Sequence, residues 1–242
     1  MSLLDQTAVG SDVPCFIEAL VAARPEIKWL KLFRPGHFPP LQDVAGLSPS
    51  EHDIIESGLR LRAETGLSFW DSTLLYLSTN VVHSQNVLKH ATRHNPQNSN
   101  HSIINRAECT DDTFRRLIAG LGKGQILAIS SAVGTDNGNQ KHIPMLDFHC
   151  KETSTNLAVV RTVIRELGLN GFIAASGGSY HFYGLNLVDT DELISILGKS
   201  LLFSPIVDHR WVAHQLIERA CGLRISPGKS YQFCPRVIDS VL

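Results

Sequence analysis

Hydrophobic residues recur at helical spacing through much of the first 90 residues. The segment 13–23 has this spacing and is closed by Pro25, and 67–77 is typical of a buried amphipathic helix. Between them, Ser48-Pro-Ser-Glu51 has the layout of a helix start. Ser48 is the predicted N-cap, a proline fills the first helical position and Glu51 closes a capping box. The pattern therefore predicts a mainly helical N-terminal module.

From residue 123 onward the pattern changes to short apolar runs, typical of strands, that alternate with amphipathic stretches. We predict strands at 125–130, 143–149, 171–176, 180–188 and 201–207. We predict helices at 153–167, 189–198 and 209–221. From residue 143 the order is β-α-β-β-α-β, the ferredoxin-like arrangement that RNA-recognition modules also use. In that arrangement the first and third strands lie side by side.

These patterns predict an α+β protein with two parts. Residues 1–122 form the helical module and residues 123–242 form the core with the ferredoxin-like order, packed together as one globular unit. The polar stretch 92–105, rich in Asn and His, is the predicted linker or mobile loop.

Composition narrows the class of protein. Of 242 residues, 43% are hydrophobic and 19% are charged, which excludes disorder as the main state. No apolar run approaches the ~18 residues of a membrane helix, and the N-terminus lacks the layout of a signal peptide, so we expect a cytoplasmic protein with no membrane partner. The net charge is −1, so a polyanion would have to be met by a local site. The five cysteines contain no C-x-x-C and are predicted to be reduced thiols.

The strand at 143–149 carries two candidate metal ligands. Asp147 and His149 are two residues apart, so their side chains are expected on one face of the strand, beside the strand that carries His181. A carboxylate and an imidazole on an open sheet face are a plausible half-site for Mn²⁺ or Mg²⁺. The alternative is a solvated pair without function, although Asp is unusual in the middle of a strand.

The hairpin turn Ser176-Gly-Gly-Ser-Tyr-His181 is a candidate phosphate site. Gly177 and Gly178 would let backbone N–H groups approach a phosphate, and Ser176 and Ser179 would add hydroxyl donors. His181 would contact the phosphate directly. The alternative is an ordinary Gly-Gly turn followed by a half-buried histidine.

Further along the chain lie an acidic and two basic candidates. Asp208 ends the run 201–207 and is either a third metal ligand or the N-cap of the helix that follows. Arg224 and Lys229 belong to a mildly basic stretch suited to a triphosphate or a strand backbone. A solvated surface explains the same stretch.

Taken in order, these motifs resemble those of the archaeo-eukaryotic primase superfamily, whose fold is shared by primases and polymerases. That family has hydrophobic-Asp-x-Asp on a strand, then an S-G-x-x-x-H-like motif, and later a hydrophobic-Asp followed by a basic segment. The matching residues here are Met145-Leu-Asp147-Phe-His149, Ser176-Gly-Gly-Ser-Tyr-His181, Ile206-Val-Asp208 and Leu-Arg-Ile-Ser-Pro-Gly-Lys229. The resemblance covers residues ~125–235 and identifies the chain as a divergent, primase-like member.

The resemblance implies a metal-dependent nucleotidyltransferase that adds nucleotides from NTP or dNTP to a 3′-hydroxyl of DNA or RNA. Two divalent ions, Mn²⁺ or Mg²⁺, would lie ~3.5–4 Å apart between the triphosphate and the attacking oxygen. The implied catalytic and metal-binding residues are Asp147, His149 and Asp208. The implied nucleotide-binding residues are Ser176, Gly178, Ser179, His181, Arg224 and Lys229. A template or primer strand would be a partner, with a helicase or other replication or defence proteins as further candidates.

One residue departs from the family pattern, and it leaves open whether the protein is an active enzyme. His149 stands where the family has a second carboxylate, which removes one negative charge from a site for two hard cations. The leading hypothesis is an active enzyme, with one tightly held ion such as Mn²⁺. The second is a catalytically degenerate primase fold that binds nucleotide or nucleic acid within a replication, repair or defence complex. The third is an interaction domain in which the motif residues are coincidental.

Overall fold

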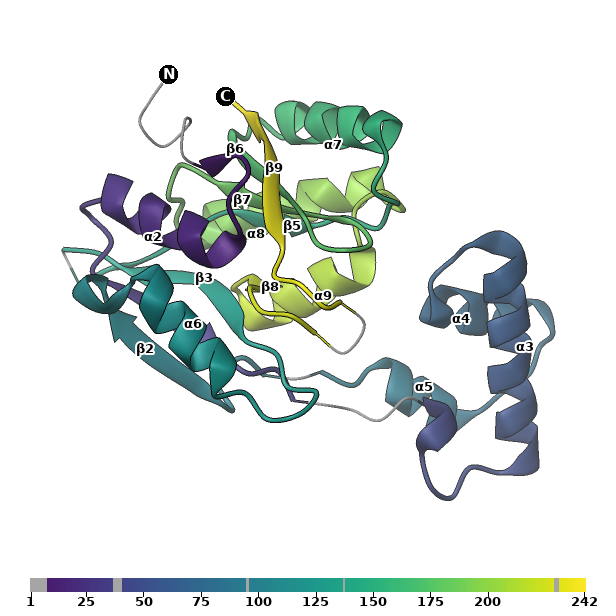
Figure 1. Cartoon of the computed structure of the whole chain (residues 1–242). Coiled ribbons are helices and arrows are strands. Elements are labelled where there is room, and N and C mark those ends of the chain that lie inside the picture. Colours follow the sequence, from purple (N-terminus) through teal and green to yellow (C-terminus); the bar gives the residue numbers. More distant parts are fainter. Residues whose placement is uncertain (1–7, 37–40, 95, 137, 229–230) are drawn as a thin grey trace. The chain divides into compact units, whose positions relative to one another are not determined.

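The structure is a computed structural model. It describes residues 8–36, 41–94, 96–136, 138–228 and 231–242 (Figure 1). The chain divides into two compact units, a larger one of residues 1–35 with 96–242 and a smaller one of residues 36–95. Each unit is built around its own apolar core.

The first sheet of the larger unit is antiparallel. Its order is β2 (His101–Asn105), β1 (Trp29–Phe33), β3 (Ala128–Gly134) and β4 (Gln140–His142). A further strand, β8 (Gly222–Arg224), pairs with the first half of β3, whereas β4 pairs with its second half. The helices α2 (Val13–Ala23) and α6 (Asp111–Ala119) pack against each other beside this sheet (Figure 1).

The second sheet is also antiparallel. Its order is β5 (Met145–Asp147), β7 (Tyr180–Gly184), β6 (Gly171–Ala175) and β9 (Arg236–Val241). The helices of this half of the unit are α7 (Ser154–Glu166), α8 (Thr190–Ser200) and α9 (His209–Glu218). Strand β5 lies against β8 of the first sheet. The two sheets therefore meet where the predicted chemical residues are concentrated.

The predicted α+β class is confirmed, and so is the pairing of the first and third predicted strands, β5 with β7. The predicted strand at 201–207 is wrong. This segment contains a short 3-10 helix (Leu201–Phe203), and only Val207 pairs, through a single bridge to Phe148. Pro205 lies in its middle and has no N–H to donate to a strand ladder. The described residues thus do not contain the complete ferredoxin-like order, and β9 extends the opposite edge of the sheet.

Two strands of the first sheet lie where the pattern predicted none. Strand β1 falls inside the predicted helical module and β2 inside the predicted linker. The strand β2 is polar because it is an edge strand in which only Ile104 is buried. Edge strands need no continuous apolar run, so their hydrophobic signal is weak.

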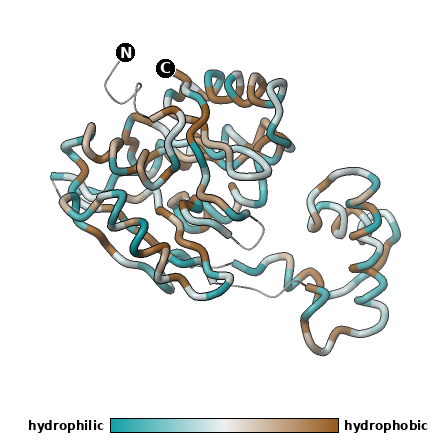
Figure 2. The backbone as a smooth tube through the Cα atoms, in the orientation of Figure 1, coloured by the Kyte–Doolittle hydropathy of each residue, from teal (hydrophilic) through white to brown (hydrophobic). Residues whose placement is uncertain are grey.

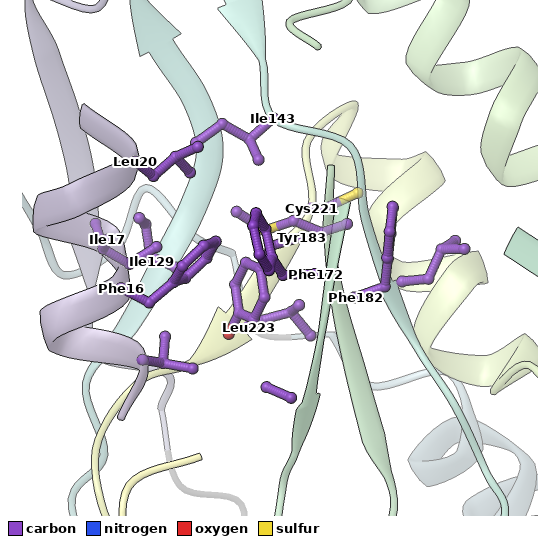
Figure 3. Packing of buried hydrophobic residues seen from close by; sticks show 14 of the residues in the cluster. Phe16, Ile17, Leu20, Ile129, Ile143, Phe172, Phe182, Tyr183, Cys221 and Leu223 are labelled. Atoms are coloured by element: carbon purple, nitrogen blue, oxygen red, sulfur yellow. The ribbon is translucent and has the colours of Figure 1, made fainter. Parts of the chain in front are cut away.

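One apolar core joins the two sheets and the helix α2 of the larger unit (Figure 3). The ring of Phe16 lies 5.1 Å from that of Phe172 and 5.7 Å from that of Tyr183, centroid to centroid. On α7 the buried side chains are Val160, Val163 and Ile164. The tube of α7 accordingly alternates between hydrophobic and hydrophilic colours in Figure 2. This core gives the strands that carry the site a rigid base.

The smaller unit consists mainly of α3 (Pro49–Thr65), α4 (Phe69–Thr79) and α5 (Gln85–Ala91). The predicted capping box is present, since Glu51 N–H donates to Ser48 Oγ and Ser48 N–H donates to Glu51 Oε2. A Cβ at Gly58 would lie 2.3 Å from Thr73 Oγ1, so α3 and α4 can pack this closely only with glycine there.

Among the described helices, none combines the length and apolar character that crossing a membrane requires. All five cysteines are free thiols.

Candidate functional site

Asp147 and His181 face each other across the β5–β7 pair. They are register partners, and His181 Nε2 lies 3.7 Å from Asp147 Oδ1. The side chains are 8% exposed for His181 and 25% exposed for Asp147. The predicted neighbourhood of these two residues is therefore found, although the separation is too long for a hydrogen bond.

Burial shifts the pKa of both groups toward the neutral form. The pKa of Asp147 is raised well above its usual value, first by burial and then by the nearby carboxylate of Asp208, while Arg224 opposes the shift. The pKa of His181 is lowered to about 3 by burial and by Arg224. The imidazole is thus neutral at pH 7 and the contact with Asp147 is not an ion pair. Its buried Nδ1 has no hydrogen-bond partner.

Asp208 lies beside Asp147 and also begins α9. Its backbone N–H donates to the Asp147 carbonyl oxygen at 3.0 Å. Its carboxylate accepts from the N–H groups of Arg210 at 3.0 Å and Trp211 at 2.9 Å. The N-cap interpretation is therefore confirmed. It does not exclude a second role, because the same carboxylate interacts electrostatically with Asp147.

His149 is placed differently from Asp147. Strand β5 ends at Asp147, and Phe148 continues the pairing only through a single bridge to Val207, so the shared strand face of Asp147 and His149 stays a prediction. The side chain of His149 is exposed, and its backbone N–H donates to Ile206 O at 2.7 Å. Among the residues that the structure describes, no three His, Cys, Asp or Glu side chains gather closely enough to hold a metal ion. A metal site formed by Asp147, His149 and Asp208 therefore stays a prediction. The three side chains are not gathered around one point in this structure.

Arg224 connects β8 to the β6–β7 turn. Its guanidinium donates to the carbonyl oxygens of Ser176 at 2.6 Å, of Phe233 at 3.3 Å and of Ser226. It also lies over the ring of Tyr231, 5.0 Å from the centroid. Burial lowers the pKa of Arg224, but arginine stays charged at neutral pH. The guanidinium is therefore a fixed positive charge close to Asp147.

The turn between β6 and β7 is already hydrogen-bonded within the chain. The Ser176 hydroxyl donates to Ser179 O at 3.0 Å, and the Ser179 hydroxyl donates to Phe148 O. Gly177 N–H donates to the Glu152 carboxylate at 2.7 Å. The predicted phosphate donors Ser176 and Ser179 are thus engaged by carbonyl oxygens in this structure. Gly178 is exposed at the tip of the turn. Lys229 lies outside the described residues.

The sequence analysis missed three neighbours of the site. Glu152 accepts from Gly177, Tyr231 covers Arg224, and the hydroxyl of Tyr183 is buried without a hydrogen-bond partner. Tyr183 lies two residues from His181 on β7, so strand alternation placed it on the same face. The sequence spacing of Glu152 and Tyr231 gave no indication of their contacts. Each contact depends on the conformation of the loop that carries the residue.

Asp147 and Asp208 are the residues whose chemistry fits a divalent ion. Burial first and repulsion by Asp208 second raise the pKa of Asp147, and a cation between the two carboxylates would remove the repulsion. Mg²⁺ is commonly held by one or two carboxylates together with substrate phosphates and water, rather than by an all-protein cage. A site with two carboxylates therefore fits an ion that arrives with a triphosphate, even without a third side chain.

A comparison with known families supports this assignment. The model of the family described as archaeo-eukaryotic primase 1D-like matches residues 105–234. The match spans more than half of the chain and includes every residue that the sequence analysis proposed for the site, from Asp147 to Lys229. The chain therefore belongs to this primase-like family. No curated protein and no solved structure matches it.

Proposed function

We propose that this protein is a nucleotidyltransferase that joins nucleotides from NTP or dNTP to a 3′-hydroxyl of DNA or RNA. The observation that carries the proposal is the meeting of Asp147, Asp208 and Arg224 where β5 lies against β8. A metal–triphosphate complex needs negative groups for the metal ion and a positive group for the phosphates. The two carboxylates and the guanidinium supply them.

Each residue has a role that follows from its position. Asp147 and Asp208 would hold the divalent ion, Mn²⁺ or Mg²⁺, and a bound ion would stabilise the negative charge that develops during phosphoryl transfer. Arg224 would neutralise the triphosphate, and neutral His181 offers its free Nδ1 to a phosphate or to water. A metal ion binds the ionised form of Asp147, whose pKa is raised, so ion affinity is expected to rise with pH.

A second function is favoured by specific observations. His149 is exposed, and Ser176 and Ser179 already donate to carbonyl oxygens. A site of this kind would bind nucleotide or nucleic acid without turnover, as a degenerate module of a replication, repair or defence complex.

The test is nucleotide incorporation on a primed template and on an unprimed single strand, with Mg²⁺ and with Mn²⁺. We expect incorporation by the wild type and at least a hundredfold loss in Asp147→Asn, the size of effect seen when one group that stabilises the transition state is removed. Asp112→Asn is the matched control, because that carboxylate is 81% exposed on α6. Nucleotide binding without incorporation would favour the degenerate module. Unchanged incorporation in Asp147→Asn would contradict the proposed active site.

A further inference from the structure

The ring of Tyr231 packs directly on the glycines of the β6–β7 turn. A Cβ at Gly177 would lie 2.7 Å from Tyr231 Cδ1, and a Cβ at Gly178 would lie 3.1 Å from Tyr231 Oη. The first separation is shorter than real Cβ contacts and the second is tighter than most of them, so the ring lies directly against both glycines. The ring therefore packs against the turn whose backbone was predicted to receive a phosphate, while Gly177 and Gly178 themselves stay exposed.

The same ring also faces the positive charge of the site. The Arg224 guanidinium carbon is 5.0 Å from the ring centroid, within the range of a cation–π contact. Tyr231 therefore touches two groups that a bound triphosphate would need, the glycine turn and the guanidinium.

Tyr231 lies on the surface and is not part of the apolar core of the larger unit. The residue is 40% exposed. Its backbone pairs with Gly228, with Gly228 N–H donating to Tyr231 O at 2.7 Å. This pairing holds the main chain in place and does not involve the ring.

We propose that Tyr231 is a specificity-determining residue, whose ring competes with the phosphates of a nucleotide for the Gly177–Gly178 turn and for Arg224. The proposal rests on the proposed function, since it concerns the phosphate end of the same site. A ligand that reaches the turn must first displace the ring. Its apparent affinity is then reduced in proportion to the fraction of molecules in which the ring is already displaced. A ligand without phosphates does not reach the turn and is unaffected.

The ring therefore acts on one class of ligand. Removing it is expected to tighten the binding of a nucleoside triphosphate by about fivefold, the size expected from one cation–π contact near the surface. The affinity for the nucleoside alone is expected to stay the same. A residue that only supported the fold would not change the ratio between these two affinities.

The experiment is calorimetric titration of the full chain with a non-hydrolysable ATP analogue and with adenosine, both in the presence of Mn²⁺. The variants are Tyr231→Ala and Tyr231→Leu, which both remove the aromatic ring, and Tyr231→Phe, which retains it. Phe233→Ala is the matched control, because this aromatic side chain lies two residues away and is 79% exposed. Thermal melting checks that each variant folds.

We expect tighter binding of the analogue in the Ala and Leu variants, and wild-type affinity in Tyr231→Phe and Phe233→Ala. Unchanged or weaker binding in Tyr231→Ala and Tyr231→Leu would overturn the competition while leaving nucleotide binding by the wild type intact. Absence of analogue binding in the wild type and in every variant would overturn both the competition and the proposed function.

Discussion

Two buried histidines in the larger unit differ in how their ring nitrogens are satisfied. His142 on β4 has a partner for each nitrogen, with Nδ1 3.0 Å from Ser131 Oγ and Nε2 3.1 Å from Thr190 Oγ1. His181 on β7 has a buried Nδ1 with no partner and an Nε2 that is 3.7 Å from Asp147. Burial lowers the pKa of both rings, to about 4 for His142 and about 3 for His181.

The difference separates a structural histidine from a candidate functional one. A buried polar atom without a partner costs free energy that the rest of the fold must offset. At His142 the surroundings have removed that cost. At His181 the cost persists next to two carboxylates and a guanidinium, which is the pattern expected where a ligand completes the set of contacts.

The largest expected effect comes from Asp208→Asn. Asparagine caps a helix about as well as aspartate, so α9 should keep its start and Tm should change little. The charge of the carboxylate is lost, and we expect nucleotide incorporation to fall by at least about a hundredfold. Melting and incorporation measured on one preparation check both parts. Wild-type incorporation would mean that Asp208 serves only as the cap.

The two histidines should respond differently to the same substitution. His142→Leu leaves the Ser131 and Thr190 hydroxyls without their partner and should cost about 2–3 kcal/mol of stability. His181→Leu removes a ring with no hydrogen-bond partner at Nδ1 and should cost under about 1 kcal/mol. Denaturant unfolding of both variants measures the difference. Equal losses would contradict the comparison.

Stability should fall as the pH is lowered from about 6.5 toward 4. Both rings have a folded-state pKa below the usual 6.5, so the unfolded chain binds more protons in this range. The histidine contribution is therefore complete above pH 6.5 and is lost as the pH falls through the folded-state values. Thermal melting across this range checks the slope, which should be shallower in His142→Leu. The raised pKa of Asp147 acts in the opposite direction, so Asp147→Asn should steepen the slope.

The smallest effect expected is a gain in stability from Asp147→Asn at pH 7. Burying a carboxylate beside Asp208 disfavours the folded state at any pH above the usual aspartate pKa. A neutral amide of the same shape removes this cost, and we expect Tm to rise by about 2–4 °C. A lower Tm would indicate that the charge of Asp147 is stabilised by Arg224 more than it is opposed by burial and Asp208.

The sequence predicted the elements whose signal is local. The helix at 13–23, the cap at Ser48 and the neighbourhood of Asp147 and His181 follow from apolar spacing, capping residues and strand order. The strand at 201–207 was predicted from apolar residues alone, and Pro205 prevented it. Strand β2 was hidden by the polarity of an edge strand. The contacts of Glu152 with Gly177 and of Tyr231 with Arg224 are made between separate elements of the fold, so no local sequence pattern predicts them.

The most direct test of the central claim is the affinity of the wild type and of Asp147→Asn for a non-hydrolysable NTP, measured with Mn²⁺, with Mg²⁺ and with neither. The account predicts that the wild type binds the nucleotide only with a divalent ion and that Asp147→Asn loses this dependence together with most of the affinity. Nucleotide binding that is equally strong without metal, or unchanged in Asp147→Asn, would contradict the assignment of Asp147 and Asp208 to a metal–nucleotide site.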